Sequence, residues 1–147
     1  MYDVRNRYLA DAVATAGPAK LLTMLYDRLL LDLDRAEAAL RAGVRAEGTQ
    51  HLAHAQEIVA EFIANLNVGA WDGGDRLLSI YTYLLSEMIG ASMAGDADRA
   101  AACRTVVAPL AEAWREAATA VAADVPTPRP ASVSEGLGAG SGVLGVG

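Results

Sequence analysis

The sequence has little of what a disulfide-stabilised, β-rich or nucleic-acid-binding protein needs. Its one cysteine, Cys103, excludes an internal disulfide. Aromatic residues make up only 5% of the chain, and alternating runs of Val, Ile and Thr are missing, which disfavours strands. The 12 basic residues are scattered singly and are outnumbered by 18 acidic residues, whereas nucleic-acid binding usually needs a basic face. We therefore expect no nucleic-acid partner.

Sequence signals for a membrane or for secretion are also missing. Residues 1–5 do not form a basic segment that leads into an apolar one, as a signal peptide would. Charged residues interrupt every apolar run before it reaches about 18 residues, the length that a membrane span needs. We therefore expect a cytoplasmic protein with no membrane insertion.

The residues that dominate the sequence, Ala and Leu, favour helices. Apolar residues recur at steps of three and four, which predicts helices over residues 18–43, about 49–67, about 75–94 and from about 96 onward. Four helices of similar length with short connections predict an all-α fold, an antiparallel up-down four-helix bundle. Pro109 lies inside the last helix and predicts a kink or a break into two helices near residues 105–109.

The sequence divides into three parts. Residues 1–16 precede the first helix and are expected to be a mobile segment that could cap a groove. Residues 17–124 form the bundle domain. Residues 125–147 contain three prolines and six glycines with little charge, which predicts a disordered tail.

Few residues in the sequence could perform chemistry. His51 and His54 lie on the second predicted helix between Glu47 and Glu57, but a metal site would need ligands from other segments. A solvated helix face is therefore the preferred interpretation. Cys103 falls on an apolar stripe and is expected to be a buried structural thiol. We predict no catalytic residue, no metal site and no cofactor.

The predicted helices over residues 18–43 and 75–94 are apolar on more than one side. Such a helix is either central in a bundle or exposes an apolar surface to a partner. Core packing is the preferred interpretation for residues on the main apolar stripes: Leu22, Leu25, Leu29, Tyr81 and Leu84. Core packing and partner contact remain equally open for residues beside the stripes: Leu21, Met24, Leu31, Ile80 and Tyr83.

The glycine-rich connection of residues 67–75 contains Trp71-Asp72-Gly73, a Trp-x-Gly between two helices. Small secreted helical hairpins of the WXG100 family carry such a motif, and Tyr83 and Glu87 have the spacing of their export signal. The signal would come too soon after the Trp, however, so a Trp that folds back onto the bundle is the preferred interpretation. A WXG100-like protein and a non-catalytic helical adaptor remain the alternatives.

Several blocks occur in a characteristic order along the chain. They are Tyr8 and Val13, then Gly17-Pro18 with Leu21-Leu22-Thr23-Met24-Leu25-Tyr26-Asp27, then Ala55, Ile58, Val59 and Leu66, then Leu77 with Ile80-Tyr81-Thr82-Tyr83-Leu84, and finally Asp96, Leu110 and Trp114. Together these blocks resemble the FliS family of flagellar export chaperones. Gly17, where the family usually has Ser or Thr, and Pro109 depart from the family's pattern.

The resemblance implies an antiparallel helical bundle that binds the C-terminal segment of flagellin in the cytoplasm. It also implies that the chaperone prevents early polymerisation and aids delivery to the flagellar type III export apparatus, with the export gate as a further partner. The N-terminal segment can cover the groove in such proteins. We expect these residues to contact the partner: Tyr8, Val13, Leu21, Leu22, Met24, Leu25, Leu31, Ile80, Tyr81, Tyr83 and Leu84.

Overall fold

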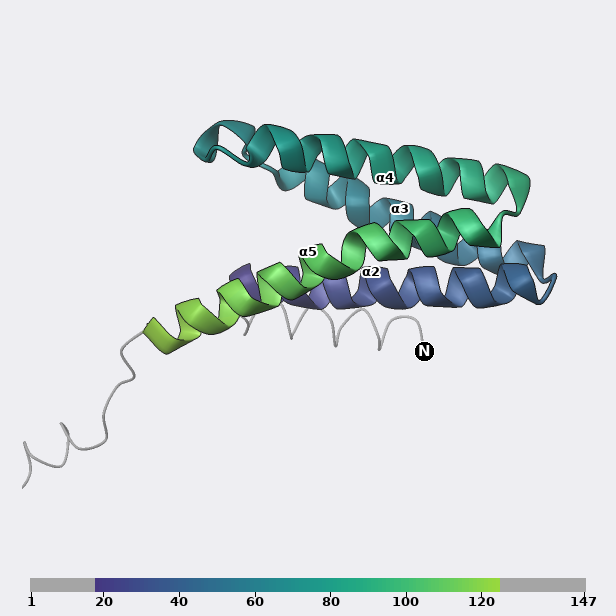
Figure 1. The fold of residues 1–147 in the computed structure, drawn as a ribbon, viewed down its shortest axis with the longest axis horizontal. Coiled ribbons are helices and arrows are strands. Elements are labelled where there is room, and N and C mark those ends of the chain that lie inside the picture. Colours follow the sequence, from purple (N-terminus) through teal and green to yellow (C-terminus); the bar gives the residue numbers. More distant parts are fainter. Residues whose placement is uncertain (1–17, 125–147) are drawn as a thin grey trace, which may run out of the picture.

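The computed structural model of the chain describes residues 18–124, and every regular element in that range is helical (Figure 1). The elements are α2 (Pro18–Arg41), α3 (Arg45–Asn65), the 3-10 helix η1 (Val68–Ala70), α4 (Gly74–Ala94) and α5 (Ala97–Asp124). The predictions for residues 1–16, including Tyr8 and Val13, and for the tail of residues 125–147 lie outside the described residues.

The four long helices form the up-down bundle that the sequence predicts. Helix α2 packs against α3 and α5, and α4 packs against the same two helices, so each helix lies beside those next to it in the chain (Figure 1). Three exposed or half-exposed ion pairs join α2 to α5: Arg41–Asp98, Arg104–Asp34 and Arg115–Asp27. Exposed pairs of this kind add little stability, so the packed side chains must supply most of it.

The second helix begins at Arg45, about four residues before the predicted start. Gly43 ends the preceding turn with φ +80°, a left-handed conformation that favours glycine. The Arg45 guanidinium then donates hydrogen bonds to the carbonyls of Ser92 and Met93 at the end of α4. The predicted start of this helix was therefore wrong by about four residues. A contact between Arg45 and the end of α4 joins two helices and leaves no pattern in the local sequence.

The connection between α4 and α5 follows the prediction closely. Gly95 ends α4 in the left-handed region at φ +65°, where a side chain would be strained. The Asp96 carboxylate accepts hydrogen bonds from the backbone N–H groups of Asp98 and Arg99, at 3.0 and 3.2 Å. Asp96 therefore caps α5, as the sequence indicates.

Pro109 does not break the last helix, because α5 is one continuous helix with Pro109 inside it. Figure 1 shows the helix changing direction about midway along its length. Proline removes the hydrogen bond that residue 109 would donate to the Thr105 carbonyl. Both residues lie on the exposed side of α5, where water can bond this carbonyl, so the helix continues through the bend.

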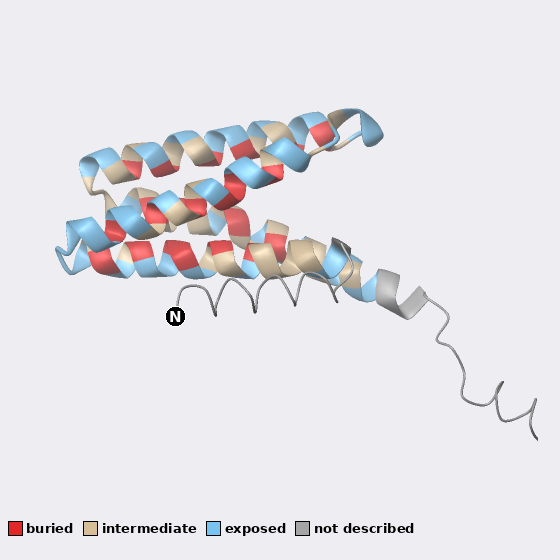
Figure 2. Cartoon of the chain, turned by 180° about the vertical axis from the view of Figure 1, so that it is seen from behind, coloured by how far each residue is buried: buried red, intermediate tan, exposed pale blue. Residues whose placement is uncertain are grey.

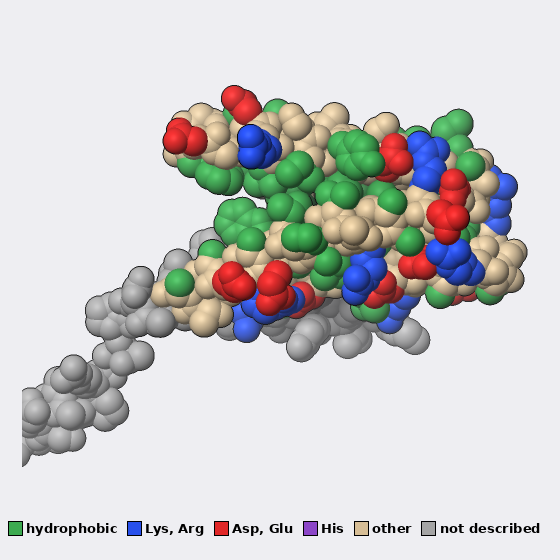
Figure 3. Space-filling view, viewed as in Figure 1, with side chains coloured by type: hydrophobic (Ala, Val, Ile, Leu, Met, Phe, Trp, Pro, Cys, Tyr) green, Lys and Arg blue, Asp and Glu red, His purple; other side chains and the backbone are tan. Residues whose placement is uncertain are grey.

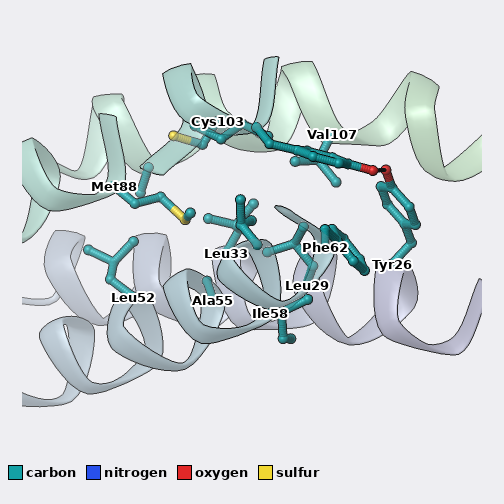
Figure 4. Packing of buried hydrophobic residues seen from close by; sticks show 14 of the residues in the cluster. Tyr26, Leu29, Leu33, Leu52, Ala55, Ile58, Phe62, Met88, Cys103 and Val107 are labelled. Atoms are coloured by element: carbon teal, nitrogen blue, oxygen red, sulfur yellow. Dashed lines mark hydrogen bonds between the residues drawn. The ribbon is translucent and has the colours of Figure 1, made fainter. Parts of the chain in front are cut away.

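One hydrophobic core lies between the helices, on the inward sides that Figure 2 shows as buried. Where α4 turns into α5, most buried residues of the core are small, including Ala91, Ala100 and Cys103, with Met88 as the large exception. Burial there raises the pKa of the Cys103 thiol to about 11, as expected for a structural thiol. At the opposite end the buried residues include the aromatic Tyr26 and Phe62 (Figure 4).

This gradient in side-chain size shapes the bundle. Small residues let neighbouring helices approach, whereas aromatic rings hold them apart. Helices α4 and α5 accordingly lie close together where they are joined and diverge toward the other end (Figure 1). The bundle is thus closed at one end and open at the end that holds the aromatic residues.

Asp32 of α2 is a charged residue with 0% of its surface exposed. Arg28 Nε donates to Asp32 Oδ1 at 3.1 Å, and His54 Nδ1 of α3 contacts Asp32 Oδ2. The prediction of a solvated face missed this contact, although the His54 side chain is still 39% exposed. His51 is less exposed, at 21%, and its partner is the exposed Glu47. The sequence could not reveal this contact because it joins two helices.

Replacing His54 with Ala should lower the free energy of unfolding by about 2–3 kcal/mol, because the buried Asp32 carboxylate loses one of two partners. His51→Ala is the matched control, and it should cost less than about 0.5 kcal/mol because Glu47 remains solvated. Urea denaturation of both variants measures the difference. Equal losses would contradict a special role for the Asp32–His54 contact.

Candidate functional site

An open cavity of about 540 Å³ lies at the end where the helices diverge. Figure 3 shows the molecule hollowed between the arm that carries the start of α4 and the opposing helix α5, with hydrophobic side chains along the walls. The residues that line the cavity are Leu21, Leu22, Leu25, Glu61, Phe62, Asn65, Leu66, Asn67, Trp71, Leu77, Tyr81 and Trp114. We refer to this cavity as the groove.

All four long helices contribute to the groove because of the up-down topology. Alternating chain direction brings together the start of α2, the end of α3, the start of α4 and the later part of α5. On each helix the lining residues recur at steps of three and four, as with Phe62 and Leu66 or Leu77 and Tyr81. The groove is therefore the open continuation of the hydrophobic core.

Three packed aromatic rings lie where the groove meets the closed core: Phe62 and Tyr81 line its floor, and the buried Tyr26 lies behind them. The Phe62 ring stacks on Tyr26 with ring centroids 4.6 Å apart and lies 5.4 Å from the Tyr81 ring. The hydroxyls of Tyr26 and Tyr81 lie 2.5 Å apart and share a hydrogen bond (Figure 4). Contacts between rings and this bond fix the positions of all three side chains.

Burial raises the pKa of Tyr26, and the hydrogen bond that it shares with Tyr81 raises it further. Burial also raises the pKa of Tyr81. Both hydroxyls are therefore neutral at physiological pH, and the floor of the groove carries no charge. An apolar side chain entering the groove meets no ionised group at its base.

Trp71 forms one wall from the connection between α3 and α4, and half of its surface is exposed. Its ring covers Gly73 so closely that a Cβ atom at Gly73 would lie 2.1 Å from the ring. Glycine at this position therefore lets the indole lie flat against the chain. The prediction that this Trp folds back onto the bundle is consistent with this placement.

The structure brings four of the predicted contact residues into the groove: Leu21, Leu22, Leu25 and Tyr81. Leu84, only 1% exposed, lies in the closed core, so a partner cannot reach it there. Met24 and Leu31 do not line the groove, although 39% of Leu31 is exposed. Both residues lie on a different face of α2 from Leu21, Leu22 and Leu25.

Ile80 and Tyr83 lie just beyond the lining residues of α4. They share a helix face with Glu87, which forms an ion pair with Arg99 of α5, so this face of α4 is turned toward α5. Ile80 is partly buried against the core and Tyr83 is half exposed. Both stay candidates for the edge of a partner surface that begins in the groove.

Sequence reasoning did not assign partner contact to five apolar residues of the groove: Phe62, Leu66, Trp71, Leu77 and Trp114. They belong to core stripes or to a loop, where periodicity alone indicates packing. One signal could have found them, because the up-down topology predicts which helix ends meet. Aromatic residues are concentrated at those ends.

The lining of the groove is mainly apolar, with few ionisable groups. Glu61 is the only carboxylate among its lining residues. Within residues 18–124, no group of three or more His, Cys, Asp or Glu side chains could hold a metal ion. The walls instead offer aliphatic and aromatic surface, which binds the apolar face of a helix.

Helix α4 is long and apolar enough to cross a membrane, judged by length and composition alone, with 28% of its apolar window buried. Among residues 18–124, α4 is the one helix that meets this length and composition test. Packing against two neighbouring helices and lining the groove both require apolar residues on α4, which accounts for its composition.

A family model for the flagellar protein FliS matches residues 1–121, a range that includes the whole groove. No curated protein sequence matches the chain. The four packed helices also exclude the two-helix hairpin of a WXG100-like protein. The chain belongs to the FliS family and is a flagellar chaperone.

Proposed function

We propose that this protein is a cytoplasmic export chaperone that binds the C-terminal segment of flagellin in the groove. Binding keeps flagellin from polymerising early and aids its delivery to the flagellar type III export apparatus, with the export gate as a further partner. The observation that supports this proposal is an apolar groove lined by all four long helices and open to solvent. Family membership supports a flagellar partner.

The groove has the features of a helix-binding surface. Its floor is aromatic and uncharged, its walls are mainly leucine and tryptophan, and polar residues such as Asn65 and Asn67 lie among its lining. An amphipathic helix can place residues spaced by three and four in such a groove. Each Å² of apolar surface removed from water contributes about 25 cal/mol.

The partner segment is proposed to be disordered when free and helical when bound. Ordering such a segment costs roughly 2–5 kcal/mol of the gross interaction energy, so extensive apolar contact is required. Tyr83 and Ile80 would extend the contact along α4 beyond the groove. Occupying the segment is sufficient to block its assembly, so the proposed function requires neither catalysis nor a cofactor.

Isothermal titration should detect binding of the last ~40 residues of the cognate flagellin, with circular dichroism showing a gain of helix on mixing. A scrambled peptide of the same composition is the control. If the flagellin segment does not bind, the proposal is wrong, and a non-catalytic adaptor with another partner becomes the better interpretation.

Replacing Trp71 with Ala should weaken flagellin binding by about tenfold or more, since a large aromatic wall residue is lost. Stability should change little because half of Trp71 is already exposed. Met93→Ala is the control, because Met93 is 76% exposed at the other end of α4 and does not line the groove. Unchanged affinity in the Trp71 variant, measured by titration, would contradict the assigned site.

Removing residues 1–16 should expose apolar surface and tighten flagellin binding, if Tyr8 and Val13 cover the groove in the empty protein. Dye binding and titration measure the two effects, and urea denaturation shows whether the bundle remains folded. The full-length double variant Tyr8→Ser, Val13→Ser should behave like the truncation. Unchanged dye binding and affinity in both proteins would rule out such a cap.

A further inference from the structure

The hydroxyls of Tyr26 and Tyr81 form a pair that cannot satisfy both of its hydrogens. The two oxygens lie 2.5 Å apart. One hydrogen bond between them uses one hydrogen and leaves the other without this partner. Both side chains are buried, with 1% of Tyr26 and 3% of Tyr81 exposed. Within residues 18–124, neither hydroxyl has another acceptor.

Trp114 of α5 indicates which hydroxyl keeps the second hydrogen. Burial has the largest effect on the pKa of both tyrosines, but their hydrogen bonds act in opposite directions. The bond with Tyr81 raises the pKa of Tyr26 and the same bond lowers the pKa of Tyr81, so Tyr26 donates it. The indole N–H of Trp114 is only a donor, and its bond to Tyr26 lowers the pKa of Tyr26. Donation therefore runs from Trp114 to Tyr26 to Tyr81, and the second hydrogen belongs to Tyr81.

The positions of the side chains place this hydrogen on the groove side of the pair. Tyr81 belongs to α4 and its hydroxyl reaches Tyr26 of α2, so its side chain crosses the closed end of the groove. Tyr81 and Trp114 both line the groove, whereas Tyr26 does not. The apolar floor therefore contains one hydrogen-bond donor that has no acceptor within residues 18–124.

A buried donor needs an acceptor, and the content of the groove decides what can serve as one. In the free protein, water that enters the open groove can accept this bond. A partner that covered the floor with apolar side chains alone would displace that water and leave the hydroxyl unpaired, at a cost in affinity. A partner that carries an acceptor at this point keeps the bond. Sites built around a buried polar group discriminate between ligands in this way.

The surroundings favour an uncharged side chain as the acceptor. Carbonyl groups inside a helix are already bonded to its own N–H groups. A carboxylate would lose its hydration on an uncharged floor, and Glu61 already lines the groove. Side chains of Ser, Thr, Asn and Gln avoid both problems. A Ser or Thr in a helix can also donate its own hydrogen to the carbonyl four residues earlier while it accepts the bond from Tyr81.

We propose that Tyr81 is a specificity-determining residue, which donates a hydrogen bond to one Ser, Thr, Asn or Gln side chain within the apolar face of the bound helix. The inference rests on the proposed function and adds the chemistry of one position in the partner segment. Leucine and tryptophan side chains of the groove contact the rest of that face. Because the acceptor must lie against one hydroxyl, this bond also fixes the register of the partner along the groove.

Tyr81→Phe and Tyr26→Phe form a matched pair of variants. Each removes one buried hydroxyl, breaks the same hydrogen bond and keeps the aromatic ring. Only Tyr81→Phe removes the donor that borders the groove. A purely structural role of the hydroxyl pair would affect both variants alike. Urea denaturation should show two folded proteins with similar losses of stability.

The probes are the C-terminal segment of the cognate flagellin and designed peptides of about 20 residues, long enough to form helices. Each Ser, Thr, Asn and Gln of the flagellin segment is replaced in turn by Ala. The designed peptides have an apolar face of Leu and Val, in which each Val is replaced in turn by Thr. Thr has the shape of Val, with a hydroxyl in place of one methyl group. Fluorescence anisotropy measures the Kd of each probe for wild type and both variants.

At one position in each probe, wild type should favour the acceptor over its apolar replacement by about threefold to tenfold more than Tyr81→Phe does. Tyr26→Phe should keep the wild-type preference at that position. At the remaining positions the three proteins should respond alike. This coupling between one protein hydroxyl and one partner side chain is the signature of a direct hydrogen bond.

Equal responses of wild type and Tyr81→Phe at every position would overturn the inference, while binding of the unmodified flagellin segment would leave the proposed function intact. A preference lost equally in both variants would also overturn it, because the hydroxyl pair would then act only by positioning the rings. Absence of flagellin binding would overturn the proposed function, and the designed peptides would then decide the inference alone. If neither kind of probe bound, both proposals would be wrong.

Discussion

The contact among Tyr26, Phe62 and Tyr81 is the constraint on which the shape of this bundle depends. These three rings occupy the interior where the closed core ends, and the bonded Tyr26 and Tyr81 hydroxyls hold α2 and α4 at a fixed separation. Small residues such as Ala91 and Ala100 occupy the opposite end. Because side-chain size sets the distance between helices, the bundle closes at one end and opens at the other.

The groove follows directly from this packing. Beyond the aromatic floor, the apolar stripes of all four long helices continue, and no other segment within residues 18–124 covers them. A stripe that is core at the closed end therefore becomes accessible apolar surface at the open end. This continuity explains how a chain with little potential for chemistry can have a defined site. In the proposed function, this apolar surface is the recognition element.

The buried Asp32 shows a different use of a polar group. It lies in the α2–α3 seam, away from the lining residues of the groove, with Arg28 and His54 as its partners. A buried carboxylate satisfied from two helices specifies how those helices meet, because other registers would leave its charge unpaired. Packing alone, dominated here by Leu and Ala, discriminates less between registers. The contact thus complements the hydrophobic core in fixing the arrangement on which the groove depends.

The sequence by itself determined the helices, their order and the up-down topology, because these depend on local periodicity, on caps such as Gly95 and Asp96, and on short connections. It also determined Leu21, Leu22, Leu25 and Tyr81 as candidates for the site. Only the tertiary structure decided that Leu84 is sealed in the core, and that Trp71 and Trp114 line the groove. Periodicity reports which face of a helix is apolar, but not whether a neighbouring helix covers that face at a given height. That outcome depends on the sizes of side chains from four separate segments, and on contacts such as Asp32–His54 and Arg45 with the end of α4, which exist only after the helices have packed.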